Sequence, residues 1–102
     1  MTSESKPDPI SLEEAAQGFA AAGSEPRLEV LLAIVRAKQD GLTVGDIQKQ
    51  LEIPASTLAH HLRFLTSAGL ITQEKRGRKV INRARAAHIE ALARYLLKEC
   101  VQ

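Results

Sequence analysis

The chain has 102 residues, 44% of them hydrophobic and 25% charged, with a formal net charge of +2, which is the length and composition of one globular domain. Its three aromatic residues indicate a modest core, of the kind that small domains often complete by oligomerising. A single cysteine excludes an internal disulfide. Because there is neither a signal-peptide pattern nor a run of about 20 apolar residues, we expect a cytoplasmic protein without a membrane segment.

The N-terminal part predicts a tail followed by a capped helix. Residues 1–9 are polar and contain two prolines, so we expect a disordered tail before one folded domain over residues 10–102. Ser11 and Glu14 have the spacing of a capping box. Apolar residues at helical spacing then continue to Gly23, which predicts the first helix.

A second helix is predicted from Arg27 to about Lys38, because Ser24 can cap it and a proline lies in its first turn. Val30 and Ile34 add apolar surface beside its main stripe, so we expect this helix to be buried on two sides. The main stripe consists of Leu28, Leu31, Leu32 and Val35.

The next two helices have the pattern of a helix-turn-helix. Thr43 can cap a short helix over residues 44–51, and a tight connection leads to Pro54, which can open another helix. This second helix ends before Gly69, a residue typical of the position just past a helix. Its core stripe is predicted to be Leu58, Leu62 and Leu65.

The opposite face of this helix is small, polar and cationic, and it carries no carboxylate. At about 100° per residue, Ser56, His60, Arg63 and Ser67 share this face, and Thr57 lies at its flank. A solvated surface is the ordinary interpretation of such a face, but hydrogen-bonding side chains free of acids also suit the major groove of DNA. His61 falls near the leucine stripe and is expected at the edge of the core.

A basic hairpin and a last helix complete the chain. Residues 70–74 and 79–82 read as two strands joined by a turn over residues 75–78. Between Pro54 and Arg83 there are six cations and one acid, the footprint of a polyanion-binding surface. The last helix is predicted from about Arg85 to Cys100.

Three segments in this order resemble the winged-helix repressors of the ArsR family: residues 56–65, residues 68–71 and residues 76–80. The resemblance extends from about Leu12 to the C-terminus. It implies a mainly α fold with a small β-hairpin, namely a winged helix-turn-helix with five helices and a two-stranded wing.

The resemblance also implies a homodimer that binds double-stranded operator DNA. Members of the family pair mainly through their first and last helices, so the expected dimer interface comprises Leu12, Phe19, Ile89, Leu92 and Leu96. Base edges or phosphates of the DNA are expected to be contacted by four residues of the recognition helix: Ser56, Thr57, His60 and Arg63. The wing cations Arg76, Arg78 and Lys79 are expected at phosphates or in the minor groove, although a charged hairpin tip can also simply protect a sheet edge.

Neither metal site typical of the family is complete in this sequence. Metal-binding members often carry two thiolates where this chain has Thr43 and Gly45, and a second family site would retain at most His88 and Glu99. We therefore predict no metal and no cofactor. Cys100 reads as a small apolar residue of the dimer helix, with an intersubunit disulfide as the alternative.

The sequence thus predicts a dimeric DNA-binding transcriptional repressor with a metal-independent trigger, or with none. The alternative interpretation is a winged-helix module that binds proteins and has no specific DNA target. No nucleophile–base pair and no glycine-rich phosphate loop is present, so an enzyme is not expected.

Overall fold

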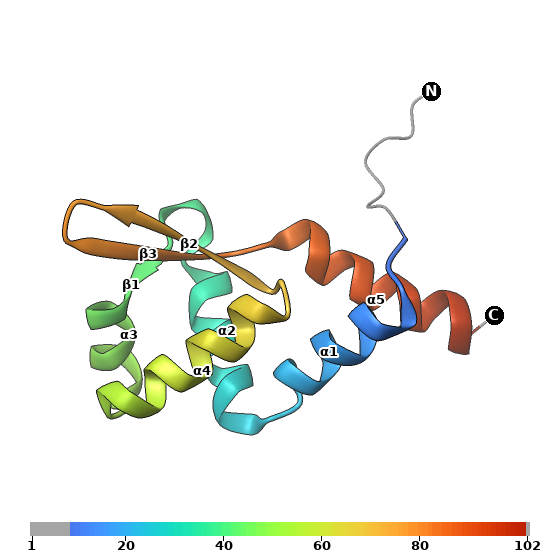
Figure 1. Cartoon of the computed structure of the whole chain (residues 1–102), viewed down its shortest axis with the longest axis horizontal. Helices are drawn as coiled ribbons and strands as arrows, with labels where there is room; N and C mark the ends of the chain where they lie inside the picture. Colours follow the sequence, from blue (N-terminus) through green and yellow to red (C-terminus); the bar gives the residue numbers. More distant parts are fainter. Residues whose placement is uncertain (1–8, 102) are drawn as a thin grey trace.

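The computed structural model describes residues 9–101, which form a mainly helical fold with a small sheet at one end (Figure 1). The tail predicted over residues 1–9 lies outside this range except for its last residue. The helices are α1 (Leu12–Ala22), α2 (Glu25–Arg36), α3 (Val44–Leu51), α4 (Ala55–Ser67) and α5 (Ala86–Cys100). The strands are β1 (Leu42–Thr43), β2 (Ile71–Arg76) and β3 (Lys79–Ala84), and a short 3-10 turn, η1, covers Lys38–Asp40.

Reciprocal side-chain caps fix where two of the helices begin. At the start of α1, Glu14 N donates to Ser11 Oγ over 3.0 Å, and Ser11 N donates back to Glu14 Oε1 over 2.9 Å. Thr43 and Asp46 make the same reciprocal pair before α3, both at 3.0 Å. These bonds satisfy N–H groups that have no partner within the helix, so the predicted starts of both helices are confirmed.

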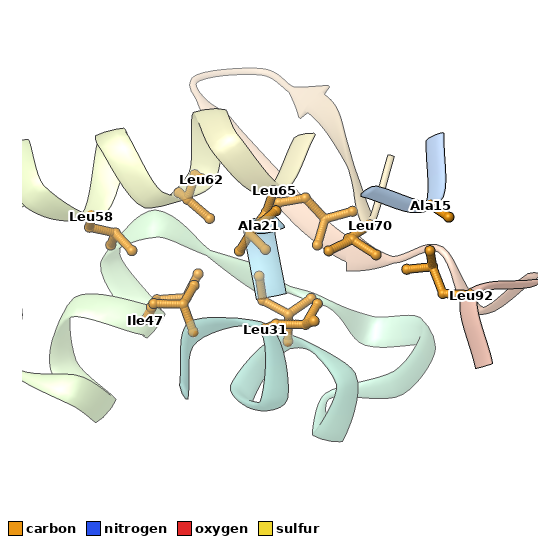
Figure 2. Close-up of a cluster of buried hydrophobic side chains, with 12 residues drawn as sticks. Ala15, Ala21, Leu31, Ile47, Leu58, Leu62, Leu65, Leu70 and Leu92 are labelled. Carbon is orange, nitrogen blue, oxygen red and sulfur yellow. The ribbon is translucent and has the colours of Figure 1, made fainter. Parts of the chain in front are cut away.

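The core lies where α4 packs over α2 and α3. The predicted stripe on α4 is confirmed, because Leu58, Leu62 and Leu65 are all buried. Figure 2 shows these side chains directed toward Ile47 of α3 and Leu31 of α2. This packing leaves the opposite side of α4 in solvent, so the polar face of the helix is exposed.

The predicted core face of α2 was wrong for three of its four residues. Leu28, Leu32 and Val35 are 40%, 38% and 39% exposed, whereas Val30 and Ile34 are completely buried. Leu31 is the only member of the predicted stripe that lies in the core. The buried side is therefore turned toward Val30 and Ile34, since α4 and the sheet approach α2 from that direction.

The wing contains one strand more than the predicted hairpin. The sheet has the antiparallel order β1-β3-β2, with Leu42 opposite Asn82. Asn82 is fully buried; its Nδ2 donates to Leu42 O over 3.1 Å, and its Oδ1 accepts from Gln73 Nε2 over 2.8 Å. One buried amide thus joins all three strands. The turn is also shorter than predicted, because only Gly77 and one further residue separate β2 from β3.

Candidate nucleic-acid interface

The outer face of α4 is exposed along its length and has no acidic residue. Ser56, Thr57, His60 and Arg63 are all in solvent, as their helical spacing predicts. The leucines on the other side hold α4 on the core, so these four side chains can approach a ligand without disturbing the fold. The structure thus brings the predicted α4 residues together on one surface.

This face is flanked by two further residues, neither of which was identified from the sequence as part of the site. Phe64 is 44% exposed, and its ring packs edge-on against the His60 ring with centroids 4.8 Å apart. Arg27 of α2 places its guanidinium carbon 4.6 Å from the centre of the Phe64 ring. The His60–Phe64 pair follows the i, i+4 spacing of a helix, but no sequence pattern connects Arg27 to them.

His61 lies on the inner side of α4, at the edge of the core as predicted. Only 8% of it is exposed, and its Nδ1 has no hydrogen-bond partner among residues 9–101. Burial lowers the pKa of His61, and the positive charges of Arg27 and His60 lower this pKa further. The imidazole is therefore neutral at pH 7 and does not add to the charge of the face.

The wing carries a cluster of cations of which only some are paired. Glu74 Oε1 accepts from Arg83 Nη1 over 2.5 Å, and its Oε2 accepts from Arg76 Nε over 3.2 Å. The Arg83 bond, followed by the Arg76 bond, holds the pKa of Glu74 below its usual range. Arg83 also donates to Gln39 O over 2.7 Å, which ties the wing to η1.

The remaining wing cations are exposed at the hairpin end. Lys75, Arg78 and Lys79 form no ion pair within the described chain. Gly77 has a φ of +60°, as the first central position of a type II′ hairpin turn requires, and this turn directs the hairpin end away from the body of the protein (Figure 1). The two predicted groups, α4 and the wing, are thus both available on the surface.

The helices expected to form the dimer interface lie side by side at the opposite end of the molecule (Figure 1). Leu92 is only 5% exposed and packs on Gly18 of α1, where an added Cβ would lie 2.7 Å from Leu92 Cδ1. Within one chain, Leu92 is therefore a core residue. The other expected interface residues retain exposed surface: Leu12 and Leu96 are 73% and 44% exposed, and Phe19 and Ile89 are half-buried.

The described residues do not assemble a metal site. Nowhere between residues 9 and 101 do three side chains of the His, Cys, Asp or Glu type come together. Thr43 is occupied in capping α3, and Cys100 is exposed at the end of α5. In the same part of the chain, no helix is both long and apolar enough to cross a membrane.

Comparisons with known proteins agree with this geometry. The family described as "Helix-turn-helix domain" matches residues 22–74, just over half of the chain. An uncharacterised HTH-type transcriptional regulator of Methanocaldococcus jannaschii is 35% identical over 65 residues, which cover 64% of this chain and 71% of that protein.

Solved structures extend the similarity over most of the fold. An ArsR-like transcriptional regulator from Rhodococcus sp. RHA1 is 32% identical, with a TM-score of 0.75 over 84% of this chain and 78% of the other. Reduced HlyU from Vibrio cholerae is 26% identical, with a TM-score of 0.68 over 88% of this chain and 92% of its own.

Proposed function

The chain belongs to the ArsR family of helix-turn-helix transcriptional regulators, and from this we propose that it acts as a homodimeric repressor that binds operator DNA in a sequence-specific manner. The observation that carries the proposal is the acid-free outer face of α4, held in solvent by a fully buried leucine stripe. Side chains that donate and accept hydrogen bonds on such a helix suit the edges of bases in the major groove.

The two parts of the surface would contribute differently to binding. His60 and Arg63 are the side chains of the α4 face long enough to reach base edges, so they would supply sequence preference. The wing cations, Arg78 above all, would meet phosphates and add affinity for any duplex. Arg76 would contribute less than Arg78 because Glu74 already engages it.

A dimer would cover apolar surface that one chain leaves in water. Besides Leu12 on α1 and Leu96 on α5, two more apolar residues near the end of α5 are exposed: Leu97 at 60% and Val101 at 70%. Apolar side chains gathered on adjacent helices typically mark a protein–protein interface. Two copies related by a twofold axis would then present two α4 helices to successive turns of the major groove.

Salt-dependent binding tests this function against that of a protein-interaction module. The wild-type protein is titrated into a labelled duplex taken from upstream of its own gene, at several salt concentrations and with candidate effectors. A DNA-binding repressor predicts a steep linear fall of log K with log[salt] and a preference over scrambled duplex. Equal, weak binding to both duplexes would reject the proposal and favour a protein partner.

A further inference from the structure

Arg27 lies at a corner where α1, α2 and α4 meet, and it contacts the other two helices. Its Nε donates to Ala21 O over 2.9 Å and its Nη2 to Ala20 O over 3.3 Å, both carbonyls in the last turn of α1. The same guanidinium lies over the ring of Phe64 on α4. We call these contacts the Arg27 clamp.

The clamp supplies hydrogen-bond donors to the C-terminal end of α1. The last carbonyls of a helix lack partners within it, and cationic side chains there interact favourably with the helix dipole. The last turn of α1 contains no basic residue of its own. Ala20 O also accepts from Gly23 N over 3.3 Å, and Arg27 of α2 supplies a further donor to this carbonyl and a donor to Ala21 O. Because two of its nitrogens are held by these carbonyls, the plane of the guanidinium is fixed, and so is the surface on which the Phe64 ring rests.

The clamp also reaches the face expected to read DNA. The Phe64 ring that lies under Arg27 meets the His60 ring edge-on, in the T-shaped arrangement that aromatic pairs favour. Stacking of a guanidinium on one ring and of that ring on the next restricts the side-chain torsions of all three residues. His60 therefore has a preferred orientation before any ligand binds.

The space beside the clamp is only partly filled by side chains. A groove of about 290 Å³ opens between α1 and α4, and the Arg27 and Phe64 side chains line it. Its other walls are Gln17, Ala20, Ala21, Ser67 and Ala68. Ala21 at the end of α1 belongs to the same buried cluster as Leu62 and Leu65 of α4. Outside that core, the guanidinium adds a contact between the end of α1 and the exposed flank of α4.

We propose that Arg27 and Phe64 are positioning residues for DNA recognition: they hold the His60 side chain and fix α4 relative to α1, and Arg27 itself does not contact DNA. The inference rests on the proposed function, since it assigns a role within the same site. It also links the helix expected at the dimer interface to the helix expected in the major groove. Together with the core packing between α1 and α4, a link of this kind would contribute to the relative orientation of the two α4 helices in a dimer.

Three variants and one control test this role. Arg27→Gln removes the clamp, Phe64→Leu removes the ring but keeps apolar volume, and Phe64→Tyr keeps the ring. Gln17→Ala alters the groove without touching the clamp. Binding is measured by fluorescence anisotropy at a temperature well below each variant's Tm. Two duplexes are used: the one that wild type binds most tightly among those recovered from a random-sequence library, and a scrambled version of it.

The positioning role predicts a selective loss. Arg27→Gln and Phe64→Leu should weaken binding to the recovered duplex by roughly three- to tenfold, in the range of one cation–π and one aromatic contact, and change binding to the scrambled duplex less than twofold. Phe64→Tyr and Gln17→Ala should match wild type. The salt slope of Arg27→Gln should equal that of wild type, whereas loss of a direct phosphate contact from both chains of a homodimer would lower it by about 1.8.

Several results would overturn the inference. A reduced salt slope for Arg27→Gln would show that Arg27 binds phosphate itself. Equal losses of affinity for both duplexes, in proportion to the fall in Tm, would show that the clamp only stabilises the fold. Unchanged affinities would show that the clamp has no role in DNA binding. If wild type bound no duplex specifically, the proposed function would fail instead. Proton NMR of the free protein would then decide the geometry, because Arg27→Gln must shift the His60 imidazole resonances if the clamp holds the Phe64 ring.

Discussion

Replacing Arg78 with alanine is the most direct perturbation of the wing. Arg78 is exposed at the hairpin turn and has no ion-pair partner among residues 9–101. Its removal should therefore leave the sheet intact, since the strands are joined by backbone pairing and by the Asn82 side chain, neither of which uses the Arg78 side chain. The free energy of unfolding should change by no more than about 0.5 kcal/mol.

The expected effect on DNA binding follows from counterion release. Each phosphate contact contributes about 0.9 to the slope of log K against log[salt], so a homodimer that loses Arg78 twice should show a slope lower by about 1.8. Between 50 and 200 mM salt, a slope difference of this size corresponds to a factor of about 12 in relative affinity. The loss should be the same on specific and scrambled duplexes, because phosphates carry no sequence information.

Anisotropy titrations of wild type and Arg78→Ala at four salt concentrations measure these slopes. Arg94→Ala is the control for the loss of a cation far from the wing: Arg94 lies on α5, at the other end of the molecule (Figure 1), where it pairs with Glu90. Its slope should equal that of wild type. Parallel slopes for Arg78→Ala and wild type would refute the reasoning, as would a loss confined to the specific duplex.

The other predictions concern α4, the dimer, pH and metal. Arg63→Ala should cost about 1–3 kcal/mol on the specific duplex and less on a scrambled one, as measured by the same titrations. Leu96→Glu should convert a dimer to monomer in sedimentation and abolish specific binding, because it places a charge on exposed apolar surface of α5. Because the pKa of His61 is depressed in the folded state, the unfolded chain binds the proton more readily than the folded one. The contribution of His61 to stability should therefore be complete above about pH 6.5 and be lost as the pH falls below this value. Thermal melts should show a flatter pH dependence for His61→Gln than for wild type. Micromolar zinc should shift the affinity for DNA by less than about tenfold, or 1.4 kcal/mol, and a stoichiometric metal that releases DNA in a titration would contradict this.

The parts of the fold predictable from sequence were those with strong local signals. Ser11 and Thr43 marked helix starts because their side chains complete backbone hydrogen bonds only a few residues away. The leucines of α4 marked its buried side because that helix has one apolar stripe. The exposed residues that we propose to face DNA then followed from the opposite side of the same helix.

The parts that sequence did not predict depend on contacts between distant segments. On α2, two apolar stripes compete, and only the approach of α4 and the sheet decides that Val30 and Ile34 are buried while Leu28 is not. Strand β1 has two residues, too few for any periodicity. The Arg27–Phe64 contact joins two helices that are separate in the sequence, so neither residue stood out from its neighbours.

Selection of duplexes from a random-sequence library tests the central claim most directly. The account predicts that wild type enriches one motif with twofold symmetry, whose half-sites are centred about one helical turn, 34–36 Å, apart, and that two copies of the chain bind each site. A library that remains unenriched after repeated rounds, or a single asymmetric site bound by one copy, would contradict the claim that a homodimer reads DNA through two α4 helices.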